Sequence, residues 1–135
     1  MKRFNIITAI VALILLTAVA CKKSQVKTPQ LEGNYKGTYQ RVGPALDNKT
    51  ANVTLTLNTG KWTGQSDIAN YPALCNGTYT FTKNKINFEN NCAFTANFNW
   101  TLILSGEYEF SQTGNELKIT KNYGNESDIY RLTKQ

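Results

Sequence analysis

Apolar and polar residues alternate along most of the chain from Leu31 onward, and this period of two limits the possible folds more than any other feature. The alternation is clear over residues 33–40, 52–58, 79–82, 86–88 and 117–119. Successive side chains of a β-strand point to opposite faces, so the pattern predicts strands with one buried face. Turn residues separate these stretches, as in Gly43-Pro44 and Asn58-Thr59-Gly60. The sequence therefore predicts an all-β fold.

Seven or eight short strands, spaced by roughly 8–12 residues, are expected between residues 31 and 135. Such a series of hairpins protects its edges by closing into a barrel or by packing as two sheets. An immunoglobulin-like sandwich is the main rival, but Cys75 and Cys92 are too close in sequence for its inter-sheet bridge, and no tryptophan lies between them. We expect a small antiparallel barrel.

Residues 98–110 keep one apolar parity for longer than most strands do. A break near Ser105-Gly106 is the more plausible interpretation, because glycine is common where a strand is interrupted. The segment 97–104 then forms either a strand of its own or a short helical plug.

The N-terminus begins with Met1-Lys2-Arg3 and continues with an uncharged, mainly apolar run over residues 6–20. This run is shorter than the about 20 residues that a membrane-spanning helix needs. Small residues then precede a cysteine in Ala18-Val19-Ala20-Cys21, an order that resembles a lipobox except that leucine usually stands at the position of Ala18. The alternatives are an uncleaved anchor or an ordinary secretory signal.

The lipobox resemblance implies a bacterial lipoprotein: a signal peptide over residues 1–20, removed before Cys21, and a lipidated cysteine. The expected modification is a diacylglycerol and an N-acyl chain such as palmitate, with no other cofactor. Residues 21–30 are polar and are expected to form a flexible tether. Lys22 stands where aspartate would favour retention at the inner membrane. The expected location is thus the cell envelope, at the outer membrane and facing the periplasm.

The chain has three cysteines, which cannot all pair with one another. If Cys21 carries lipid, Cys75 and Cys92 form an even pair in an oxidising compartment, and a disulfide between them is expected. Two free buried thiols are the alternative. The absence of histidine and the wide cysteine spacing both argue against a metal site.

Charge and composition exclude several functions. The net charge is +6, but five of the fifteen Lys and Arg residues precede Leu31, so ten basic residues face nine acidic ones in the rest of the chain. Nucleic-acid binding is not expected of so balanced a domain. Without histidine, Ser-His and Cys-His catalytic pairs are also excluded. Glu107 and Glu109 share a strand face and are either a glycosidase-type carboxylate pair or, as we favour, a solvated face. We expect no enzyme.

Several Gly-x-Tyr pairs give a second resemblance. Gly33-Asn34-Tyr35 is similar to the Gly-x-Trp start of lipocalins, and Arg131 stands where a lipocalin arginine packs over that ring. Cys75-x-Gly77-x-Tyr79 and Gly106-x-Tyr108 resemble motifs of small lipocalin-like bacterial lipoproteins. The resemblance implies a lipocalin-like barrel.

Amphipathic rings are the best candidates for a binding site, because they line cavities while their polar tips form hydrogen bonds. A lipocalin-like barrel would hold a small hydrophobic ligand or contact an envelope protein. The alternative is a structural lipoprotein whose barrel is filled by its own side chains and which acts by surface contact. Tyr71-Pro72 is expected near the barrel rim, where any opening would lie. The candidate ligand-binding residues are Tyr35, Tyr39, Trp62, Tyr79, Trp100 and Tyr108.

Overall fold

The computed structural model describes residues 30–135, which form eight strands and one short 3-10 helix. Their bounds are β1 Gly33–Val42, β2 Thr50–Asn58, β3 Lys61–Ser66, β4 Asn76–Phe81, β5 Lys85–Asn90, η1 Trp100–Leu102, β6 Gly106–Thr113, β7 Glu116–Tyr123 and β8 Glu126–Lys134. The predicted signal peptide, Cys21 and the tether up to residue 29 lie outside the described residues. Within residues 30–135, no helical segment has the length and apolar character of a membrane span.

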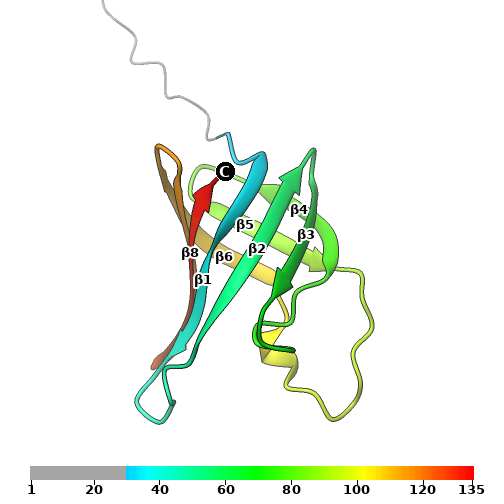
Figure 1. The fold of residues 1–135 in the computed structure, drawn as a ribbon, viewed down its shortest axis with the longest axis vertical. Helices are drawn as coiled ribbons and strands as arrows, with labels where there is room; N and C mark the ends of the chain where they lie inside the picture. Colours follow the sequence, from blue (N-terminus) through cyan, green and yellow to red (C-terminus); the bar gives the residue numbers. More distant parts are fainter. Residues whose placement is uncertain (1–29) are drawn as a thin grey trace, which may run out of the picture.

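The eight strands form one closed antiparallel barrel in which neighbours in sequence are neighbours in space (Figure 1). The barrel closes where β8 pairs with β1, from Tyr35 opposite Lys134 to Val42 opposite Ser127. The predicted all-β fold and small antiparallel barrel are confirmed. The sandwich is wrong because a single continuous sheet holds all eight strands.

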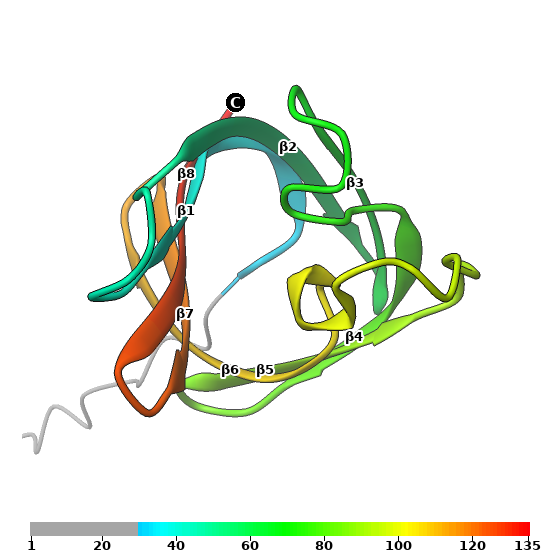
Figure 2. The same cartoon turned by 90° about the horizontal axis from the view of Figure 1, so that it is seen from below.

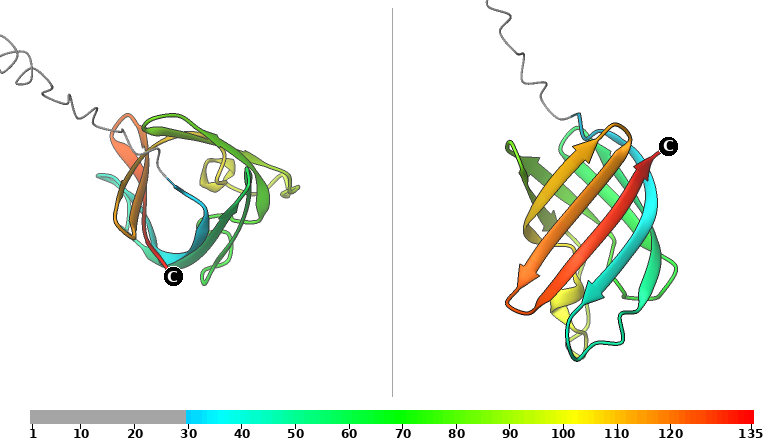
Figure 3. Two further views of the ribbon diagram at one scale, coloured as in Figure 1. Left: turned by 90° about the horizontal axis from the view of Figure 1, so that it is seen from above. Right: turned by 90° about the vertical axis from the view of Figure 1, so that its left-hand side faces the viewer.

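The two ends of the barrel differ. At one end, which we call the terminal end, lie the start of β1, the end of β8 and three tight turns. At the other, which we call the loop end, lie the connections 43–49, 67–75, 91–105 and 124–125. Two of these connections are long, and the segment 91–105 contains η1. The right-hand view of Figure 3 shows β6, β7, β8 and β1 side by side, with the β7–β8 hairpin at the loop end.

The alternation of the sequence decides which side chains face the interior. Its large inward residues are almost completely buried, among them Tyr35, Tyr39, Trp62, Tyr79, Phe88, Tyr108 and Tyr130. Polar residues between them point outward, as the period of two predicted. The barrel core is therefore built from aromatic rings together with leucine and isoleucine side chains.

Two inward glycines explain why a small residue recurs two positions before a tyrosine. A Cβ atom on Gly37 would lie 1.9 Å from the carbonyl oxygen of Arg131, and one on Gly77 would lie 1.7 Å from that of Glu89. Neighbouring strands approach so closely there that no side chain fits. Small residues beside large rings are a common way to fill the interior of a small barrel.

The long apolar parity of residues 98–110 is interrupted as expected. β6 begins at Gly106, whose φ of +83° lies in the left-handed region that favours glycine. Before it, Trp100–Leu102 form η1 rather than a strand. The Asn99 side chain caps this helix by accepting a hydrogen bond from the Thr101 amide at 3.1 Å. The break near Ser105-Gly106 and the short helical alternative are both confirmed.

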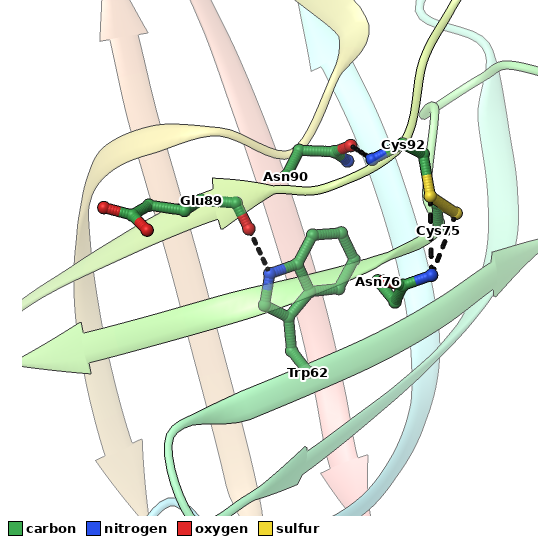
Figure 4. Close-up of a disulfide and its surroundings, with 6 residues drawn as sticks. All are labelled: Trp62, Cys75, Asn76, Glu89, Asn90 and Cys92. Atoms are coloured by element: carbon green, nitrogen blue, oxygen red, sulfur yellow. Dashed lines mark hydrogen bonds between the residues drawn. A yellow bond between two sulfur atoms is a disulfide. The ribbon is translucent and has the colours of Figure 1, made fainter.

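A disulfide joins Cys75, just before β4, to Cys92, just after β5 (Figure 4). The two Cα atoms are 6.4 Å apart. The side-chain amide nitrogen of Asn76 lies 3.4 Å from each sulfur. Beside the disulfide, the indole N–H of Trp62 donates a hydrogen bond to the carbonyl of Glu89 at 3.0 Å. The predicted pairing is confirmed, and it ties the two long connections of the loop end together.

Candidate functional site at the loop end

Helix η1 lies within the ring of strands when the barrel is seen from the loop end (Figure 2). The β3–β4 connection holds it there through an isolated parallel bridge between Ala73 and Ile103. The Ala73 amide donates to the carbonyl of Leu102 at 2.9 Å, and the Leu104 amide donates to the carbonyl of Ala73 at 3.3 Å. The β3–β4 connection thus holds this segment, which we call the plug, at one side of the loop end.

A buried ion pair fastens this plug to the barrel wall. Arg41 on β1 and Asp128 on β8 are register partners, and their side chains are only 8% and 3% exposed. Arg41 donates through Nε to one carboxylate oxygen at 2.6 Å and through Nη2 to the other at 2.7 Å. It also donates to the hydroxyl and the carbonyl of Thr101 on η1, both at 2.7 Å. One guanidinium therefore links β8 to η1.

Two tyrosines complete the surroundings of this ion pair. The Tyr39 hydroxyl donates to Asp128 at 2.6 Å, and burial together with this hydrogen bond raises the pKa of Tyr39. The Tyr71 ring packs edge-on against Tyr39 at 5.2 Å between centroids. The Tyr71 hydroxyl donates to the carbonyl of Lys49 at 2.9 Å. Tyr71 thus lies at the barrel rim, where the sequence placed it.

Lys121 on β7 is the second inward-facing cation of the loop end. Its ammonium group donates to the carbonyl of Ser105 at 2.8 Å and lies 5.0 Å from the ring centroid of Tyr108 and 5.3 Å from that of Tyr123. Burial lowers the pKa of Lys121. Burial and the nearby Asp128 carboxylate raise the pKa of Tyr123 to about 12, so its hydroxyl stays protonated at neutral pH.

Five of the six predicted ligand-binding residues face the interior, and one does not. Tyr35, Tyr39, Trp62, Tyr79 and Tyr108 are at most 5% exposed. Trp100 is 58% exposed, so the expectation that its ring faces the interior is wrong. Its parity was counted as though it lay on a strand, whereas it lies on η1 and outside the barrel core.

The inward rings contact one another across the barrel. Neighbouring ring centroids lie 4.8–6.3 Å apart along the series Trp62, Phe88, Tyr108, Tyr130 and Tyr39. Such distances are typical of aromatic pairs in protein cores. These side chains therefore fill much of the barrel interior.

The arginine expected to pack over Tyr35 is also placed differently. Arg131 is exposed, because its neighbours Tyr130 and Leu132 take the inward positions of β8. The buried arginine is Arg41, which sequence reasoning missed. A usable signal existed, because Arg41 continues the inward parity of Tyr35 and Tyr39 beyond the last apolar residue.

Glu107 and Glu109 lie on the outer face of β6, opposite the buried Tyr108 and Phe110. Glu107 pairs with Lys85, and both side chains are about half exposed, at 59% and 49%. This hydrogen bond raises the pKa of Lys85. The solvated-face interpretation of the two carboxylates is confirmed.

A groove of about 660 Å³ lies on the outer wall of β1, β2 and β3. It is lined mainly by polar side chains, and Asp67 within it already accepts two hydrogen bonds from Asn52, at 2.8 Å and 2.7 Å. The groove contains none of the predicted aromatic residues. The concentration of charged and aromatic groups therefore makes the loop end the stronger candidate site.

No family model, no curated protein and no solved structure matches this chain.

Proposed function

We propose that the protein is a lipid-anchored lipoprotein of the cell envelope whose barrel contacts an envelope partner through its loop end, without enzymatic activity. The N-terminal basic residues, the short apolar run and Cys21 support the anchor. The Cys75–Cys92 disulfide is consistent with export, because disulfides persist in oxidising compartments. The proposed location is the outer membrane, with the barrel in the periplasm.

The exposure of Trp100 carries the proposal of a partner contact. A tryptophan ring that is 58% exposed is unusual on a small domain, and here it lies on a helix that is held in place from two sides. Phe94 and Phe98 stack on each other in the same connection, with centroids 5.3 Å apart. Residues 90–106 contain no charged side chain. Protein interfaces are enriched in aromatic residues and depleted of charge at their centres.

The packing of the interior supports surface contact over a ligand held deep in the barrel. The rings that would line a cavity are in contact with one another, and Arg41 fastens η1 to the wall of the loop end. A barrel of eight strands is just wide enough to be filled by side chains or to hold one small molecule. The filled-barrel alternative therefore fits the described residues better.

Site-specific photocrosslinking in envelopes of the native host tests the partner contact. A benzoylphenylalanine is placed at Trp100 and, as a matched control, at Phe81, which is 37% exposed and precedes a turn of the terminal end. We expect a reproducible crosslinked protein from position 100 and none from position 81. Equal crosslinking from both positions, or none from position 100, would contradict the proposal.

A Trp100→Ala variant gives the matching affinity measurement once the crosslinked protein is identified. Central tryptophans of interfaces commonly contribute about 2 kcal/mol or more, so binding should weaken at least about 30-fold. Intact-mass analysis of the protein from native membranes tests the anchor separately. We expect a chain beginning at acylated Cys21, and a retained first residue would refute the anchor while leaving the partner contact open to its own test.

A further inference from the structure

Three charged side chains form a row across adjacent strands at the loop end. Arg41 on β1 is the register partner of Asp128 on β8, and Asp128 is the register partner of Lys121 on β7. The three strands run side by side in the right-hand view of Figure 3. Register partners in an antiparallel sheet share a face, so the row consists of a carboxylate between two cations on the inner wall.

The Asp128 carboxylate forms an ion pair with only one of these two cations, Arg41. Both oxygens of Asp128 accept from Arg41, and one also accepts from Tyr39. Within residues 30–135, the ion pairs are Arg41–Asp128 and Lys85–Glu107, so Lys121 has no carboxylate partner. The row of two cations and one carboxylate therefore has a net charge of +1, and Lys121 is the cation outside the ion pair.

The surroundings of Lys121 are shaped to receive its ammonium group. A Cβ atom on Gly106 would lie 3.0 Å from Nζ, so the glycine leaves room for the charge. The groups in contact with it are neutral: the Ser105 carbonyl and the rings of Tyr108 and Tyr123. An ammonium group has three N–H donors, and the hydrogen bond to Ser105 uses one of them.

We propose that the loop end binds a small monocarboxylate, whose carboxylate pairs with Lys121 beside Tyr108 and Tyr123. A monoanion matches the single unneutralised charge of the row. A phosphate is disfavoured because Arg41, the side chain suited to bidentate phosphate binding, is committed to Asp128 and Thr101. This inference is independent of the proposed partner contact, which rests on Trp100.

The lowered pKa of Lys121, whose main cause is burial, provides the readout. A bound carboxylate favours the charged amine and must raise this pKa. The opposing influences are Arg41, which lowers the pKa, and Asp128, which raises it. Tyr108 and Tyr123 stay neutral because burial raises the pKa of each.

The test follows the lysine side-chain signals of the full-length protein, ¹³C-labelled at lysine, in neutral detergent. Sodium butyrate is titrated, with sodium chloride at equal ionic strength as the control and inorganic phosphate as a second arm. We expect a saturable shift of the Lys121 signal and a raised pKa with butyrate alone. The exposed Lys118 on the same strand should show neither change.

Variants separate the site from general electrostatics. Lys121→Met should weaken butyrate binding at least 10-fold, whereas Lys118→Met should leave it unchanged. Lys121→Arg keeps the positive charge and should retain butyrate binding. If Lys121→Met fails to fold, butyrate binding by Lys121→Arg is the second measurement. No saturable shift, an equal response at Lys118, or equally strong binding of phosphate would each overturn the proposal.

Discussion

Replacing Asp128 with asparagine tests whether the buried ion pair fastens the loop end. The substitution keeps the shape of the side chain but removes its charge. Asp128 accepts three short hydrogen bonds, from Tyr39 and Arg41 at 2.6 Å and again from Arg41 at 2.7 Å. After the change, the Arg41 guanidinium is left buried without a counter-ion, and removing one partner of such a pair costs about 3–5 kcal/mol.

This cost is large for a domain of this size. A domain of about 100 residues is typically stable by about 5–15 kcal/mol, so Asp128→Asn should still fold but with little margin. The melting temperature should fall by at least about 12 °C, taking about 4 °C for each kcal/mol. Urea unfolding followed by far-UV circular dichroism, with the disulfide kept oxidised, measures the free energy of unfolding. The slope m should stay constant if only stability changes.

The exposed ion pair of Lys85 and Glu107 supplies the matched control. Its side chains are 49% and 59% exposed, so Glu107→Gln should leave the free energy of unfolding almost unchanged. Hydrogen exchange adds a local readout, because the amides of η1 should lose protection in Asp128→Asn before the rest of the barrel does. If Asp128→Asn costs no more than Glu107→Gln, the buried pair does not hold the plug, and this account of the loop end is refuted.

Three further predictions concern other parts of the barrel. Reducing the Cys75–Cys92 disulfide, whose cysteines are 17 positions apart, should lower the free energy of unfolding by about 3 kcal/mol in urea titrations with and without reductant. Gly37→Ala should cost about 3 kcal/mol or more by the same assay, because its Cβ would meet the β8 backbone at 1.9 Å, whereas Gly114→Ala, in open space, should cost only about 1–2 kcal/mol. Because the pKa of Tyr123 is raised from 10 to about 12 in the folded protein, its contribution to the free energy of unfolding is fully present below pH 10. This contribution is lost as the pH rises toward about 12. Ultraviolet titration of tyrosinate in the wild type and in Tyr123→Phe measures the pKa of Tyr123. An ordinary pKa near 10 would contradict the partial burial of this side chain beside Asp128.

Local pattern was enough to predict most of the fold. The period of two identified the strands and their inward residues, including Tyr35, Trp62 and Tyr108. Glycine at a turn, as in the β2–β3 hairpin, marked where strands end. The disulfide could also be predicted, because assigning lipid to Cys21 left two cysteines to pair. All these inferences use neighbouring residues or simple counting.

The site was predicted less well because its residues come together only when the barrel closes. Arg41 and Asp128 are 87 positions apart, and Arg41 and Thr101 are 60 positions apart. Nothing local indicates that an arginine at the end of β1 will be neutralised by β8. Trp100 was misplaced for a similar reason, since the bridge between Ala73 and Ile103 and the hydrogen bonds from Arg41 hold η1 where it is.

By itself, the sequence determined where the strands lie, which of their apolar side chains face inward and which parts of the chain carry charge. These features depend on the two-residue repeat of a strand and on turn residues, both of which are local. Only the tertiary structure decided that Asp128 neutralises Arg41 and leaves Lys121 without a carboxylate partner in the described region. That choice depends on the register in which β8 joins β1 and β7, and register is a property of the closed sheet.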